Sequence, residues 1–111
     1  MEQLQFSTNW NNKLAGNFYT TLRLASPKFQ IGKVFDVYLS GKFLHKAQVA
    51  DIKIVMLNQI NAYIAGLDTG YSVAQTKDIL TKMYTGKDWS QQRLVLVLLQ
   101  VITEKKDRTQ P

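Results

Sequence analysis

Residues 93–102, with the sequence RLVLVLLQVI, carry the strongest fold signal in the chain. Positions 94–99 form an unbroken apolar run, LVLVLL. A short apolar run of this kind predicts a strand that is buried on both faces, either in the middle of a sheet or where a barrel closes. The run is far too short to span a bilayer, for which about 20 apolar residues are needed.

Three earlier segments, residues 18–24, 34–39 and 43–56, also have the pattern of strands. They are rich in aromatic and β-branched side chains, and turn residues separate them. Within the third segment the alternation of apolar side chains changes phase. This change predicts a β-bulge near Ala50 and Asp51.

Helical periodicity is found in three segments. The spacing of apolar residues predicts a short helix over residues 9–15 and a second helix over residues 57–67. Ser72 and Gln75 have the spacing of a capping box, which predicts a third helix that begins after Ser72 and ends at Gly86.

The order of these elements is helix, three strands, two helices and a last strand. It predicts an α+β fold, a small mixed β-barrel with helices packed at one opening. The chain has 111 residues and no internal linker, so residues 1–102 are expected to form one domain. Residues 103–111 are a charged C-terminal tail, which we expect to be disordered.

The composition argues against several kinds of function. The chain has no Cys and a single His, His45, which leaves too few soft ligands for a zinc or iron site and no Cys nucleophile. We therefore expect no metal and no cofactor. The N-terminal residues lack the apolar core of a signal peptide, so the expected location is the cytoplasm, without a membrane partner.

The formal net charge of the chain is +6. A basic domain attracts polyanions, so a nucleic acid such as RNA is a candidate partner. The alternative is that the lysines solvate exposed strand faces. The sequence does not indicate an oligomeric state.

Residues 18–24 place two sets of side chains on opposite faces of a strand. Tyr19, Thr21 and Arg23 form the more polar set and are candidate residues for the wall of a cleft. An arginine there could bind a phosphate or the edge of a base through paired hydrogen bonds. The alternative for Arg23 is a surface position where it pairs with a nearby carboxylate. The alternative for Thr21 is that it is present only because threonine has a high β-propensity.

Asp68 and Lys28 complete the candidate ligand-binding set. A carboxylate at position 68 could orient an amino group of a base or act as a general base. The sequence Asp-Thr-Gly also suits a turn, which is the alternative interpretation. Lys28 falls in the loop between two predicted strands, and we expect it on the rim of the cleft.

Several short motifs follow one another along residues 6–102. They are Leu14 and Gly16, Thr21-Leu22-Arg23, Lys28-Phe29, Gly32-Lys33, Asp68, and Met83-Tyr84-Thr85-Gly86. In this order they resemble the ASCH domain, a branch of the PUA-like β-barrel superfamily. The resemblance implies a PUA-like barrel with a cleft shaped for a nucleobase, a nucleoside or an RNA end.

Members of this family that hydrolyse acetylated cytidine place a Lys, a Thr and a Glu in the cleft. The resemblance puts the Thr on Thr21 and the acid near Asp68, but the Lys on Phe18, which can neither accept nor donate a proton. It therefore favours a module that binds nucleic acid, a nucleoside or a nucleotide. An amidohydrolase of small acylated nucleobases, with Thr21, Asp68 and Lys13, is the alternative, and a protein-interaction domain with a degenerate cleft is the second alternative.

Overall fold

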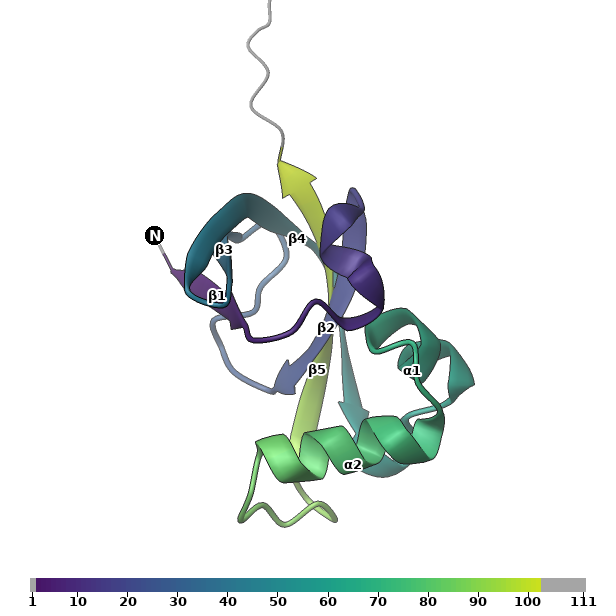
Figure 1. The fold of residues 1–111 in the computed structure, drawn as a ribbon. Helices are drawn as coiled ribbons and strands as arrows, with labels where there is room; N and C mark the ends of the chain where they lie inside the picture. The colour runs from purple at the N-terminus through teal and green to yellow at the C-terminus, as the bar shows by residue number, and fades with distance from the viewer. Residues whose placement is uncertain (1, 103–111) are drawn as a thin grey trace, which may run out of the picture.

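The structure, a computed structural model, describes residues 2–102 and contains one strongly curled sheet with helices beside it (Figure 1). In chain order the elements are β1 (Gln3–Phe6), the 3₁₀ helix η1 (Trp10–Ala15), β2 (Phe18–Leu24), β3 (Val34–Leu39), β4 (Lys42–Met56), the 3₁₀ helix η2 (Leu57–Gln59), α1 (Ala62–Asp68), α2 (Val73–Met83) and β5 (Arg93–Ile102). The predicted α+β class and the mixed, barrel-like sheet are confirmed. The predicted tail, residues 103–111, lies outside the described residues.

The five strands are arranged in the order β1-β3-β4-β5-β2. β1 pairs in parallel with β3, and the remaining neighbours are antiparallel. β5 is hydrogen-bonded on both sides, to β4 and to β2, so the strand predicted from the apolar run does lie inside the sheet.

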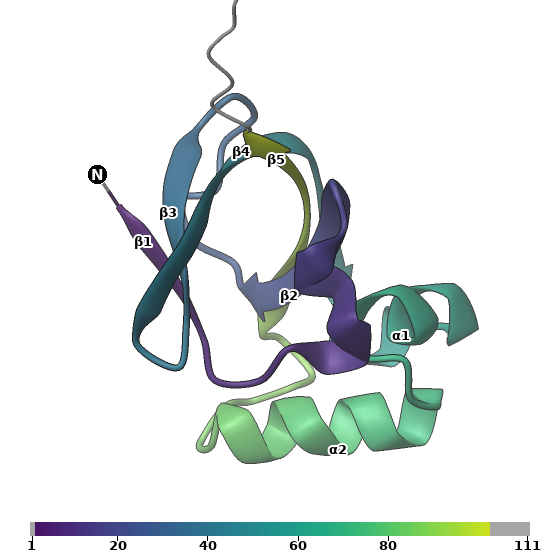
Figure 2. The same cartoon turned by 45° about the horizontal axis from the view of Figure 1, so that its top comes forward.

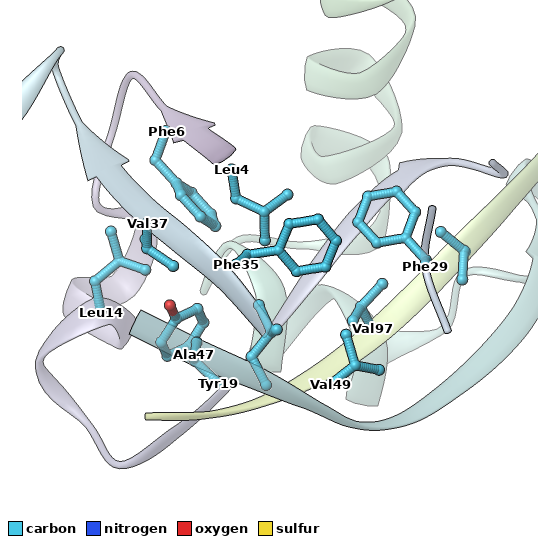
Figure 3. Close-up of a cluster of buried hydrophobic side chains, with 12 residues drawn as sticks. Leu4, Phe6, Leu14, Tyr19, Phe29, Phe35, Val37, Ala47, Val49 and Val97 are labelled. Carbon is cyan, nitrogen blue, oxygen red and sulfur yellow. The ribbon is translucent and has the colours of Figure 1, made fainter. Parts of the chain in front are cut away.

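Side chains of β5 alternate between two apolar clusters. Val95, Val97 and Leu99 belong to the cluster that fills the interior of the curled sheet (Figure 3). Leu94 and Leu96 belong to a second cluster, which includes apolar side chains of α1 and α2. Burial on both faces explains why the strand has a continuous apolar sequence rather than an alternating one.

α2 runs across one end of the curled sheet, and η1 lies between β2 and α1 (Figure 2). Leu80 of α2 and Ile64 of α1 are buried against Leu22 of β2 and Leu94 of β5 in the second cluster. A helix at one opening of a barrel is the arrangement that the sequence predicts.

The strands β1 and β2 are the two edges of the sheet, and side chains join them. The Arg23 guanidinium on β2 donates a hydrogen bond of 2.9 Å to the Gln5 carbonyl on β1. The same guanidinium lies 4.6 Å from the centre of the Phe6 ring, and Phe6 packs edge to face against Tyr19. One arginine and two aromatic rings therefore join the two edges of this half-barrel at a seam that has no backbone pairing.

The predicted bulge is confirmed, because the register of β4 against β5 shifts between Val49 and Asp51. The sequence prediction misses β1. Only Leu4 and Phe6 of this strand are buried, and two apolar residues in four are too few to show alternation. The pairing of β1 with β3, which is distant in sequence, stabilises it instead.

The single helix predicted over residues 57–67 is wrong. The chain forms η2 first and then begins α1 after Asn61, whose side chain accepts a hydrogen bond from the Ile64 N–H and so caps a new helix. The capping box of Ser72 and Gln75 at the start of α2 is confirmed. α2 ends at Met83 rather than at Gly86.

Candidate functional site

The short helix η1 contains two consecutive residues in the left-handed region, Asn11 with φ 56° and Asn12 with φ 52°. Asparagine tolerates this conformation better than most residues. The Asn9 side chain accepts from the Leu14 N–H and donates to Asn12 Oδ1, which holds the turn together. This turn brings the next residue, Lys13, toward the interior.

Asn11 also docks η1 onto α1. Its amide donates a hydrogen bond of 3.2 Å to the Gly66 carbonyl. Gly70, with φ 80°, faces the same side chain, and a Cβ at position 70 would lie 2.9 Å from Asn11 Cγ. The close approach of these two segments therefore requires a glycine at position 70.

Lys13 and Asp68 form a buried ion pair. The distance from Lys13 Nζ to Asp68 Oδ1 is 2.7 Å, and the two side chains are 6% and 8% exposed. Burial lowers the pKa of Lys13, and the charge of Asp68 acts in the opposite direction. Asp68 is the buried last residue of α1, and the turn that the sequence Asp-Thr-Gly suggests follows it at Thr69 and Gly70. The Asp68 carboxylate itself pairs with Lys13.

The ion pair lies in the wall of a cavity between β2, the segment after β1, and α2. Polar side chains in the wall include Lys13, Thr21, Arg23, Asp68 and Tyr84, and the apolar ones include Trp10, Ile79 and Met83. The cavity has a volume of about 80 Å³ and is partly open to solvent. A closed cavity of about 150 Å³ holds one benzene-sized ring, so this cavity has room for part of a small ring whose remainder lies at the open side.

Thr21 and Arg23 are hydrogen-bonded to each other, because Arg23 Nε donates to Thr21 Oγ1 at 3.0 Å. Thr21 is 3% exposed. Its hydroxyl oxygen accepts the bond from Arg23, so the hydroxyl proton can be donated to a ligand. Arg23 has further N–H donors besides those that bind Thr21 and the Gln5 carbonyl. Burial lowers the pKa of Arg23, but a guanidinium remains charged at neutral pH.

Two cations and one carboxylate therefore share the cavity wall. The positive charges of Lys13 and Arg23 exceed the negative charge of Asp68, which favours an electron-rich or anionic group. The hydrogen-bond donors of Lys13, Thr21 and Arg23 stand beside the acceptor oxygens of Asp68. Such a wall can bind a ring that presents a carbonyl oxygen next to an N–H group.

The structure brings together Thr21, Arg23 and Asp68 of the predicted ligand-binding set, and also Lys13, the amine of the hydrolase alternative. Lys28 is not among the cavity residues. It lies in the loop between β2 and β3, with its ammonium 5.2 Å from the centre of the Phe29 ring.

Tyr19 is buried inside the barrel rather than in the cavity wall. Its hydroxyl is 2.8 Å from His45 Nε2, and burial raises the pKa of Tyr19. Phe18, the position where the family resemblance puts a Lys, is 54% exposed and does not line the cavity.

Sequence reasoning did not assign Tyr84 and Trp10 to the site. Tyr84 caps the C-terminus of α2 and lines the cavity. Trp10 is half-buried and also lines the cavity. The motif Met83-Tyr84-Thr85-Gly86, which belongs to the family resemblance, is the sequence signal that could have pointed to Tyr84.

Within residues 2–102 no group of three or more His, Asp or Glu side chains is close enough to hold a metal ion. The described helices also include none with the length and apolar character needed to cross a membrane.

The fold is similar to those of two solved structures. The hypothetical protein PH0355 aligns with a TM-score of 0.68 and 14% sequence identity, over 92% of this chain and 100% of its own. The protein EF3133 from Enterococcus faecalis V583, assigned to the family DUF984, aligns with a TM-score of 0.66 and 11% identity, over 98% of this chain and 85% of its own. No family model and no curated protein matches the sequence. At these identities the similarity shows a shared fold.

Proposed function

We propose that this chain is an ASCH-like module of the PUA-like barrel type that binds one nucleobase of an RNA, a nucleoside or a nucleotide in the cavity. One observation carries the proposal. Thr21, Arg23 and Asp68 were selected from the sequence as ligand-binding residues, and they line one cavity together with Lys13.

The size and polarity of the cavity support a base as the ligand. A partly open cavity of about 80 Å³ can take the edge of a single pyrimidine-like ring but not a whole nucleoside. A pyrimidine presents carbonyl oxygens and ring or exocyclic N–H groups along one edge, and the wall offers donors from Lys13, Thr21 and Arg23 beside the carboxylate of Asp68. Trp10 and Met83 provide apolar surface for the faces of a ring.

A second candidate function is an amidohydrolase of a small acylated base such as acetylated cytidine. The observation that favours it is the presence of Lys13 in the same cavity wall as Thr21 and Asp68. Lys13 is held in an ion pair, however, and an ammonium paired with a carboxylate is a fixed charge rather than a free base. Thr21 already accepts a hydrogen bond from Arg23, so binding is the better-supported use of the hydroxyl.

Calorimetric titration with cytidine, uridine and their monophosphates tests the proposal, with Thr21→Val as the perturbation. The loss of one hydrogen bond is expected to weaken binding by roughly 3- to 10-fold. Thr20→Val is the matched control, because Thr20 is a buried neighbour on the same strand that does not line the cavity. Equal affinities for the two variants would contradict the assigned role of Thr21.

Chromatography of acetylated cytidine incubated with the protein separates the two functions. We expect no deacetylation above the rate without protein. Deacetylation that is lost in both Thr21→Val and Lys13→Met would instead establish the hydrolase. If the chain neither binds nor converts any of these compounds, the protein-interaction alternative with a degenerate cleft is favoured.

A further inference from the structure

An aromatic pair stands at the edge of the cavity. Trp10 lines the cavity, and its ring packs edge to face against Tyr71, with 5.9 Å between the ring centres. Tyr71 does not line the cavity, and it is 49% exposed. The Trp10–Tyr71 pair, which we call the aromatic ledge, therefore extends the apolar wall of the cavity outward to solvent.

The sequence around the ledge is nearly free of carboxylates. Residues 3–35 contain no Asp or Glu, and residues 52–77 contain only Asp68, which is buried against Lys13. These two segments supply Trp10, Tyr71 and most of the cavity wall. α2 supplies the rest of the wall, and its exposed carboxylate, Asp78, is paired with Lys82. A phosphate chain that passes the ledge would meet no exposed carboxylate of these segments, and the net charge of +6 would attract it.

The cavity and the ledge together are larger than one ligand ring. The cavity has room for no more than one small ring, so a group that stacks on the ledge must belong to a neighbouring part of the same ligand. Single-stranded nucleic acids are recognised by aromatic side chains on which successive bases stack. An apolar peptide could also use such a surface, but it would not explain why residues 3–35 and 52–77 contain no exposed carboxylate.

We propose that the ligand is a single-stranded oligonucleotide, of which one base enters the cavity and the adjacent base stacks on the aromatic ledge. This inference rests on the proposed function, because it presumes that the cavity takes a base. It adds that the preferred ligand is a strand rather than a free nucleoside. It also assigns to Tyr71 a role that the cavity alone does not give it.

The test compares two ligands and three variants. Affinity for a labelled pyrimidine hexanucleotide is measured by fluorescence anisotropy, and affinity for the mononucleotide by calorimetry. Tyr71→Ala is expected to weaken hexanucleotide binding about 5- to 100-fold and to leave mononucleotide binding unchanged. Tyr71→Phe, which keeps the ring, is expected to retain the affinity of the original chain. Tyr38→Ala is the matched control, since Tyr38 forms a similar edge-to-face pair with Phe43 on β3 and β4.

The outcomes distinguish this inference from the function on which it rests. If the mononucleotide binds but Tyr71→Ala leaves hexanucleotide affinity unchanged, the ledge is not a base platform, although the cavity still binds a base. If neither ligand binds, both proposals fall. RNA and DNA of the same sequence are compared, and dependence on Tyr71 with either one supports the proposal. A dimer in sedimentation experiments that Tyr71→Ala abolishes would identify a second copy as the occupant and overturn it.

Discussion

Replacing Asp68 with asparagine keeps the shape of the side chain and removes the negative charge that pairs with Lys13. Both side chains are less than a tenth exposed, so the ammonium would remain buried without its carboxylate. Removing one partner of a buried ion pair costs about 3–5 kcal/mol. For a domain of this size, about 3 kcal/mol corresponds to a fall in Tm of at least about 12 °C. A total stability of about 5–15 kcal/mol is typical, so the variant should still fold.

The loss of stability should depend on pH in a defined direction. Burial lowers the pKa of Lys13 below its ordinary value of 10.5, and Asp68 offsets part of this shift. Without Asp68 the pKa of folded Lys13 falls further, while that of the unfolded chain does not. Between the two pKa values the unfolded chain binds the proton that the folded chain lacks, so stability rises with pH. The deficit of Asp68→Asn should be largest at neutral pH and shrink as the pH approaches 10.5.

Urea unfolding followed by tryptophan fluorescence, at pH 7 and at pH values up to about 10, measures both effects. The control is the double variant Lys13→Met with Asp68→Asn, which removes the buried ammonium as well. It should be more stable than Asp68→Asn alone at pH 7 and should lack the recovery at high pH. If the free energy of unfolding of Asp68→Asn at pH 7 is within about 1 kcal/mol of that of the original chain, the buried ion pair is refuted.

Three further predictions concern the elements that position the site. Gly70→Ala should lower the melting temperature by more than Gly41→Ala. The two glycines have φ values of 80° and 81°, but of these two only position 70 would bring the new Cβ against another side chain. Equal losses would contradict the close contact of Gly70 with Asn11. Leu99→Ala should lower the free energy of unfolding, measured in urea, by about 2–5 kcal/mol, and Leu98→Ala should lower it by less. The reason is that Leu99 is fully buried and Leu98 is half-buried. The reverse order would contradict the assignment of the barrel interior. Arg23→Gln should lower the free energy of unfolding by about 1.5–3 kcal/mol, because the guanidinium joins β1 to β2. It should also weaken nucleoside binding, because Arg23 lines the cavity. Unchanged stability would contradict the role of Arg23 at the seam.

The strands that could be predicted from the sequence are those whose burial is encoded within a few residues. β5 is buried on both faces, and its sequence is an uninterrupted apolar run. The bulge in β4 is visible in the sequence as a change of phase in the alternation of apolar side chains. β1 could not be predicted in the same way, because half of its four residues are exposed. Its place in the sheet depends on parallel pairing with β3, which local sequence does not show.

The composition of the site was predictable in part. Alternation along β2 correctly placed Thr21 and Arg23 on one side, but it could not show that Tyr19, with the same parity, lies deeper inside the barrel. Lys13 could be named only as a possible substitute amine. Its contact with Asp68 spans 55 positions and depends on two left-handed asparagines, a conformation that no periodicity predicts.

The position of the cavity follows from the way in which the sheet fails to close. An edge strand leaves backbone groups without a partner strand, and the Gln5 carbonyl of β1 is one of these groups. If β1 and β2 were paired by backbone hydrogen bonds, that carbonyl would be satisfied and the space between the strands would be filled. Instead Arg23 reaches across from β2 to donate to it, so a side chain joins the two edges where a backbone ladder is missing. The seam therefore contains a charged group, an adjacent threonine and part of the cavity. The residue that closes the barrel is for the same reason one that lines the candidate site.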